Sequence, residues 1–142
     1  MTEEKTKRAL EIQEGLRHFT GSEQWYRHGL VRSVLYTEGV QFLAEKAEAY
    51  WLIDKIASLQ LEPTIRAEPF QVWKLIVINV VAKDGSNRKR TAVLTATDGD
   101  KGIGPVVLHR EAIDFTDFPL DEIELWVEQS DGYVIILLPT EH

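Results

Sequence analysis

The pattern of hydrophobic and polar positions changes its period about halfway along the chain. In residues 3–18, Ala9, Ile12 and Leu16 recur at helical spacing between charged positions, which predicts an amphipathic helix. Residues 40–60 have the same period, and they are apolar nearly all round after residue 48, so we expect a buried helix there, bent or broken near 46–48.

The segment between these two helices is ambiguous. Thr20 and Glu23 have the spacing of a capping box, which predicts a short helix through Trp25 and Tyr26. Residues 30–39 fit either a strand or a helix, and Thr37 is well placed to cap the helix that follows.

Short segments with a period of two dominate the second half, which predicts strands. In one of them Leu125 and Val127 face one side, and glutamates face the other. Asp131 and Gly132 predict a tight turn into the last segment, which is apolar on both faces and should be central or covered. The predicted strands cover residues 70–81, 91–97, 105–109, 122–129 and 133–139.

This order of elements predicts an α+β fold, in which N-terminal helices pack on one face of a C-terminal antiparallel sheet of four to five strands. The chain has 142 residues, which fits a single domain over 1–142, with a helical half at about 1–62 and a sheet half at about 70–139. In the connector "DFTDFPLDE", we expect Phe115, Phe118 and Leu120 to be anchored in the core.

Several blocks of sequence resemble a family of small bacterial proteins known only as a domain of unknown function. The resemblance covers roughly residues 16–138 and implies one conserved architecture, of bacterial or mobile-element origin. It implies no activity, cofactor or catalytic residue. The blocks are FTGSEQWYRH, LYTEGVQFLAE, AYWLIDKIASLQ, FQVWKL and TDFPLDEIELW.

Composition and charge restrict the class of protein. The chain has no cysteine, which excludes disulfides and thiolate metal sites. The charged N-terminus lacks the apolar segment of a secretory signal, and the apolar runs are much shorter than the roughly 20 residues that span a bilayer, so we expect a cytoplasmic protein without a membrane partner.

The net charge of −7 is unevenly distributed. No Lys or Arg follows Arg110, whereas residues 83–90 form a basic loop. Direct nucleic-acid binding normally needs a basic face, so we do not expect it. Nine acids follow Arg110, namely Glu111, Asp114, Asp117, Asp121, Glu122, Glu124, Glu128, Asp131 and Glu141.

No familiar catalytic or metal motif is present. The four histidines form no pair at helical spacing, and "DGDKGIG" begins like a calcium loop but lacks the required glycine and final glutamate. There is no nucleophile elbow, P-loop or dinucleotide fingerprint. We therefore assign no catalytic or metal-binding residue and expect no cofactor.

The leading hypothesis is a non-enzymatic binding or protein-interaction module with an acidic sheet face. Its contact surface is predicted to be Glu122, Glu124, Trp126 and Glu128, with Trp126 as the anchor because tryptophan is enriched among interface hot spots. Self-association through the same face is a variant of this hypothesis.

Two alternatives stay open. One is a small-molecule-binding protein or hydrolytic enzyme with a pocket formed by Tyr26, Arg27, His28, Tyr36 and Glu38, because aromatic, cationic and imidazole groups often gather in ligand sites. The other is an acidic inhibitor that occupies a basic nucleic-acid-binding surface of a partner.

Overall fold

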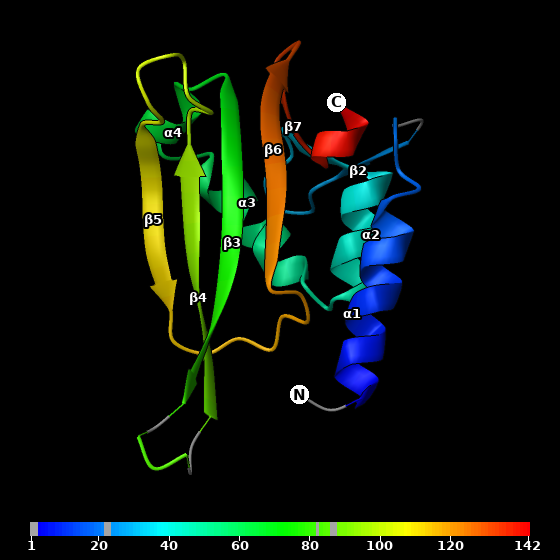
Figure 1. The fold of residues 1–142 in the computed structure, drawn as a ribbon. Coiled ribbons are helices and arrows are strands. Elements are labelled where there is room, and N and C mark those ends of the chain that lie inside the picture. The colour runs from blue at the N-terminus through cyan, green and yellow to red at the C-terminus, as the bar shows by residue number, and fades with distance from the viewer. Residues whose placement is uncertain (1–2, 22–23, 82, 86–87) are drawn as a thin grey trace.

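The computed structural model describes residues 3–21, 24–81, 83–85 and 88–142. Over these residues the protein is α+β, as predicted, with a seven-stranded sheet in the order β1-β2-β7-β6-β3-β4-β5 (Figure 1). The helices are α1 (Glu3–Leu16), α2 (Glu38–Lys46), α3 (Tyr50–Leu59), α4 (Pro63–Arg66) and the 3₁₀ turn η1 (Pro139–Glu141). The strands are β1 (Trp25–Arg27), β2 (Val34–Thr37), β3 (Phe70–Val81), β4 (Arg88–Thr97), β5 (Val107–Ile113), β6 (Glu122–Ser130) and β7 (Tyr133–Leu137).

The predicted sheet of four to five antiparallel strands is too small, because the N-terminal part of the chain supplies two more. β1 is a strand where a short helix was predicted, and it pairs antiparallel with β2. β2 in turn pairs parallel with β7, so the sheet is mixed. The first half of the chain therefore supplies strands to the sheet as well as helices. The capping-box residue Glu23, and Ser22 before it, lie outside the described residues.

The predicted buried helix is confirmed, together with its break. It forms α2 and α3, which are separated at Ala47–Ala49, where Glu48 adopts a left-handed φ of 53°. Thr37 caps α2 as predicted, because its Oγ1 accepts a hydrogen bond from the amide of Val40 at 3.3 Å.

The helices leave one face of the sheet uncovered. In Figure 1 strands β3, β4, β5 and β6 stand in front, α3 lies behind them, and α1 and α2 lie to one side. Side chains of α2 and α3 share one buried cluster with the inward rows of the strands. The cluster includes Val40, Leu43, Leu52, Ile53, Ile56, Trp73, Leu75, Leu94, Leu125, Val127 and Ile136.

A buried amide network lies inside this core and joins α3, α4 and β3. Gln71 is fully buried, and its side chain exchanges hydrogen bonds with that of Gln60 at 2.8 and 3.0 Å. It accepts a third bond from Nε1 of Trp73 at 2.9 Å and donates to the carbonyls of Ile65 and Glu68. The network satisfies polar groups that would otherwise be costly to bury.

Glu141 attaches the end of the described chain to the start of α2. Its carboxylate accepts hydrogen bonds from the Thr37 hydroxyl at 2.6 Å, the Gly39 amide at 3.2 Å and the Leu138 amide at 2.9 Å. A buried carboxylate at a helix N-terminus receives otherwise unpaired amides and the favourable end of the helix dipole. The contact holds η1 beside β2 and α2.

The connector before β6 is anchored by only two of the three predicted residues. Phe118 and Leu120 are buried, but Phe115 is 72% exposed, so the prediction for Phe115 is wrong. The Thr116 hydroxyl accepts the amide of Phe118 at 3.1 Å, and the Arg90 guanidinium donates to the Phe118 carbonyl. These bonds fix the turn so that only one phenylalanine can reach the core.

Within the described part of the chain, no helix combines the length and apolarity needed to cross a bilayer.

Candidate functional site

The uncovered face of β3 carries a row of apolar side chains. Residues of β3 alternate, and the inward row Gln71, Trp73, Leu75 and Val77 is buried. The outward row contains Phe70, Val72, Lys74, Ile76 and Ile78, and Ile76 and Ile78 remain 42% and 44% exposed. Large apolar side chains on an open sheet face are unusual in the absence of a binding role.

The four residues predicted as a contact surface all lie on this open face. Glu122, Glu124, Trp126 and Glu128 alternate with Leu125 and Val127, which are buried. Each stands opposite a member of the outward β3 row, because the register pairs Ile76 with Glu122, Lys74 with Glu124, Val72 with Trp126 and Phe70 with Glu128. An acidic row therefore runs directly beside an apolar row.

A groove of about 650 Å³ lies along these two rows, and we call it the open-face groove. Its volume is within the range of known ligand sites. The turn after β4 forms one wall. The groove is lined by Phe70, Val72, Lys74, Ile76, Thr95, Thr97, Gly99, Asp100, Pro105, Glu124 and Trp126.

Trp126 is held in place at one end of the open-face groove. Its ring meets Phe70 edge-to-face with 5.3 Å between centroids, and it meets His142 in the same way at 5.2 Å. Its Nε1–H donates to Oε2 of Glu124 at 3.0 Å. These contacts hold the indole in one orientation.

Most charges of the open-face groove are negative. Lys74 is paired with Glu124 at 3.5 Å, and Glu128 lies 3.3 Å from Nε2 of His142. Glu122 and Asp100 complete the acidic border, and both are exposed. Glu124 is bound to Lys74 and Trp126 rather than to a second acid.

A second hollow, of about 370 Å³, is lined by residues of α3, β2 and the loop after β1. We call it the tyrosine pocket. His28 and Asp54 both line it, and Nε2 of His28 lies 2.7 Å from Oδ1 of Asp54. The pocket is lined by His28, Gly29, Leu30, Tyr36, Tyr50, Ile53 and Asp54.

The structure brings together some of the residues predicted to form a pocket. Tyr26 stacks on Tyr36 across the β1–β2 pair, with 5.7 Å between ring centroids, and His28 lines the same pocket as Tyr36. Arg27 points elsewhere and lies over the ring of Tyr133 at 5.7 Å. Glu38 begins α2 and does not line the pocket.

The phenols of the tyrosine pocket sit in a negative environment. Burial raises the pKa of Tyr36, and the charges of Asp54, Tyr26 and Glu45 raise it further. Burial also raises the pKa of Tyr50, with a further contribution from Glu45, which is hydrogen-bonded to it.

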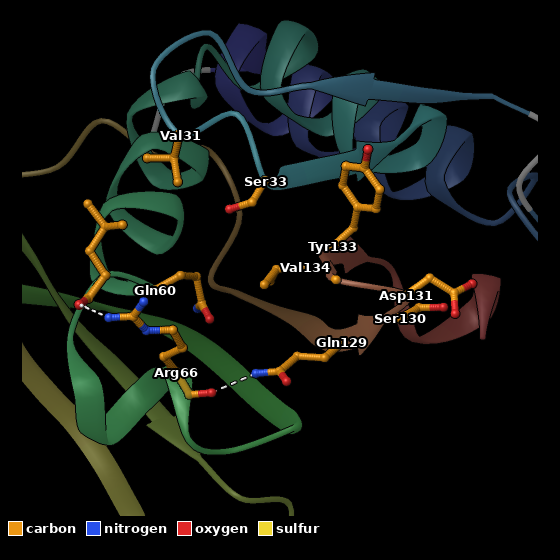
Figure 2. Close-up of a pocket in the computed structure, with 11 residues that line it drawn as sticks. Val31, Ser33, Gln60, Arg66, Gln129, Ser130, Asp131, Tyr133 and Val134 are labelled. Carbon is orange, nitrogen blue, oxygen red and sulfur yellow. Dashed lines mark hydrogen bonds between the residues drawn. The ribbon is translucent and has the colours of Figure 1, made fainter.

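A third pocket, of about 430 Å³, lies at the β6–β7 turn and is drawn in Figure 2. Its polar side chains are bonded across the hollow. Gln129 donates to the carbonyl of Arg66 at 2.6 Å, and the guanidinium of Arg66 donates to the carbonyl of Leu61 at 3.3 Å (Figure 2). The bond from Gln129 joins β6 to α4.

The loop that resembles a calcium site binds its own backbone. Oδ1 of Asp98 accepts the amides of Asp100 and Val106, and Oδ1 of Asp100 accepts those of Gly102 and Gly104. Among residues 3–21, 24–81, 83–85 and 88–142, no three His, Asp or Glu side chains gather to hold a metal ion.

Sequence reasoning missed part of each site. Phe70, Val72 and Ile76 were not singled out, because both rows of β3 are largely apolar and the pattern does not tell which one is covered. Tyr50 and Asp54 were also missed, although their spacing of four residues on a helix places them on one face.

Comparison with known proteins gives a family but no function. The family model described as "Family of unknown function (DUF6876)" matches residues 10–142, in agreement with the resemblance seen in the sequence. No curated protein and no solved structure matches the chain.

Proposed function

The chain belongs to the family of unknown function DUF6876, and we propose that it is a protein-interaction module that binds a partner in the open-face groove. The observation that supports this proposal best is the uncovered apolar row of β3, with Trp126 fixed beside it. Exposed apolar surface with a polar border is typical of interaction sites, and tryptophan is a common hot spot within them.

The charge of the groove favours a basic partner. Glu122 and Glu128 stand opposite Ile76 and Phe70, so a complementary segment would carry apolar side chains beside Lys or Arg. A second copy of this chain is a poor occupant, because each copy has a net charge of −7 and would meet its own acids. We therefore propose a basic, amphipathic segment of another protein.

A displayed library of random peptides, selected on the immobilised protein, tests the proposal while the natural partner is unidentified. We expect enriched sequences that combine apolar residues with Lys or Arg, and binding that weakens as salt increases. Trp126→Ala should weaken their binding by about 30-fold, the loss typical of a hot spot.

The matched control is Trp25→Ala. Trp25 is 51% exposed on β1 and does not line the groove, so its removal should leave peptide binding unchanged. Circular dichroism should show that both variants stay folded. Enrichment of acidic peptides, no enrichment at all, or equal losses in the two variants would contradict the proposal. A dimer in light scattering that Trp126→Ala dissociates would identify a second copy as the occupant instead.

The charge contribution can be separated from the apolar one. Glu122→Gln with Glu128→Gln should slow association and flatten the salt dependence, while the apolar preference of the peptides persists. If the doubly substituted protein selects the same basic peptides at the same affinity, the argument from charge is wrong.

A further inference from the structure

The tyrosine pocket is separate from the open-face groove, and its walls have a distinct chemistry. Tyr36 comes from β2, and Tyr50 and Asp54 come from α3. Glu45 of α2 does not line the pocket, but its charge acts on both tyrosines. One face of the Tyr36 ring is covered by Tyr26, and Tyr36 also lines the hollow. Binding sites for organic cations combine aromatic rings with carboxylates, because the ring faces and the carboxylates both carry negative potential.

Among the described residues, none of the groups whose charges act on the two phenols of the pocket is a cation. Asp54, Glu45 and the neighbouring tyrosines all raise the pKa of Tyr36 or Tyr50, and none of these groups is positive. In the part of the chain that the structure describes, the charges that act on these two phenols are therefore all negative.

His28 is held in place by three hydrogen bonds. Its Nδ1 accepts the backbone amides of Leu30 and Val31, at 3.2 and 3.0 Å, so the proton must lie on Nε2, which donates to Asp54 at 2.7 Å. Asp54 is oriented by this bond, yet its side chain remains 66% exposed. The imidazole thus positions a carboxylate at the pocket.

We propose that the tyrosine pocket binds an organic cation, an alkylated ammonium group or a guanidinium, against Tyr36 and Tyr50 and beside Asp54. The hollow of about 370 Å³ is at the small end of known ligand sites, which suits a small amine or a single basic side chain. Asp54 and Glu45 supply the negative charge, and the rings supply the surface that receives the alkyl groups.

Choline and its neutral isostere 3,3-dimethylbutanol test the proposal directly. Choline should shift the aromatic proton signals of the tyrosines in NMR titrations, and the isostere, which has the same shape without the charge, should not. Tyr50→Ala and Asp54→Asn should each weaken choline binding by about 10-fold. Equal shifts from the neutral isostere, or no choline-dependent shift up to a concentration of about 50 mM, would overturn the proposal.

Two further variants keep the test specific. Tyr50→Phe retains the ring face and should retain choline binding, which separates the ring from its hydroxyl. Tyr133→Ala removes a tyrosine that lies outside the pocket and should have no effect. Trp126→Ala should also leave choline binding intact, so failure here and failure of the interaction proposal are distinguishable.

The source of the cation is decided by a second pair of probes. Peptides that carry lysine or trimethyllysine compete with choline if the pocket takes a side chain of a protein. Weaker binding of both peptides than of choline indicates a free amine. Unchanged choline binding in Tyr50→Ala, with the fold intact by circular dichroism, would refute the site for either source.

Discussion

Replacing Gln71 by Met removes the centre of the buried amide network while almost preserving the length of the side chain. The change breaks the five hydrogen bonds that the Gln71 side chain makes. It leaves Nε1–H of Trp73 and the amide of Gln60 without these partners, and the two side chains are 1% and 3% exposed.

The size of the effect follows from these two orphaned groups. An unsatisfied buried polar group costs about 1–3 kcal/mol, and the apolar Met side chain returns about 1 kcal/mol, so we expect a net loss of about 3 kcal/mol in the free energy of unfolding. With an m-value of about 2 kcal/mol/M in urea, the midpoint should fall by about 1.5 M.

Urea denaturation followed by circular dichroism measures this loss. Gln13→Met makes the same chemical change at an exposed position of α1 and should alter stability by less than about 0.5 kcal/mol. A loss below about 1 kcal/mol for Gln71→Met, at an unchanged m-value, would refute the view that the buried polar groups around Gln71 need its hydrogen bonds.

Two other predictions concern a helix start and a turn. Gly39→Ala should destabilise the protein by about 1–3 kcal/mol in the same assay, although alanine favours helices, because its Cβ would lie 2.6 Å from Cδ1 of Leu138 and 2.7 Å from Oε1 of Glu141. An increase in stability would contradict this packing. Hydrogen bonds from the amides of Val106 and Asp100 lower the pKa of Asp98 in the folded protein. Its carboxylate therefore stabilises the fold above the unfolded pKa of about 4, and this stabilisation is lost as the pH falls through the folded pKa. The free energy of unfolding should therefore be measured for wild type and Asp98→Asn from pH 2 to pH 7. The difference between the two proteins should be largest above about pH 5 and should shrink in acid. A difference that does not depend on pH would show that the carboxylate charge is irrelevant.

The sequence correctly predicted features that depend on residues close together in the chain. Thr37 was predicted as a cap because a cap and the amide it binds are only three residues apart. The alternation around Trp126 gave the correct open face of β6, since one row there is apolar and the other acidic.

Long-range pairing explains what the sequence did not show. Residues Trp25–Arg27 follow helix-start signals, but they form a strand because β2 offers a partner, from Trp25 opposite Thr37 to Arg27 opposite Leu35. The contact between His28 and Asp54 joins residues 26 positions apart and has no local signature. Phe115 was expected to be buried by its hydrophobicity alone, and the turn held by Thr116 leaves it outside.

β7 lies in the middle of the sheet although it is the last strand to be synthesised, and this affects folding during translation. Val34 of β2 pairs with Val134 of β7, which leaves the ribosome about one hundred residues later, or roughly 5 to 20 seconds at ordinary rates of synthesis. During that interval β2 lacks its β7 partner and has unpaired backbone groups along that edge, whereas β6 precedes β7 directly and waits only briefly. The nascent protein therefore passes through a stage in which the β2 edge is open, which is the stage at which chaperones would protect it and at which chains truncated before β7 would aggregate.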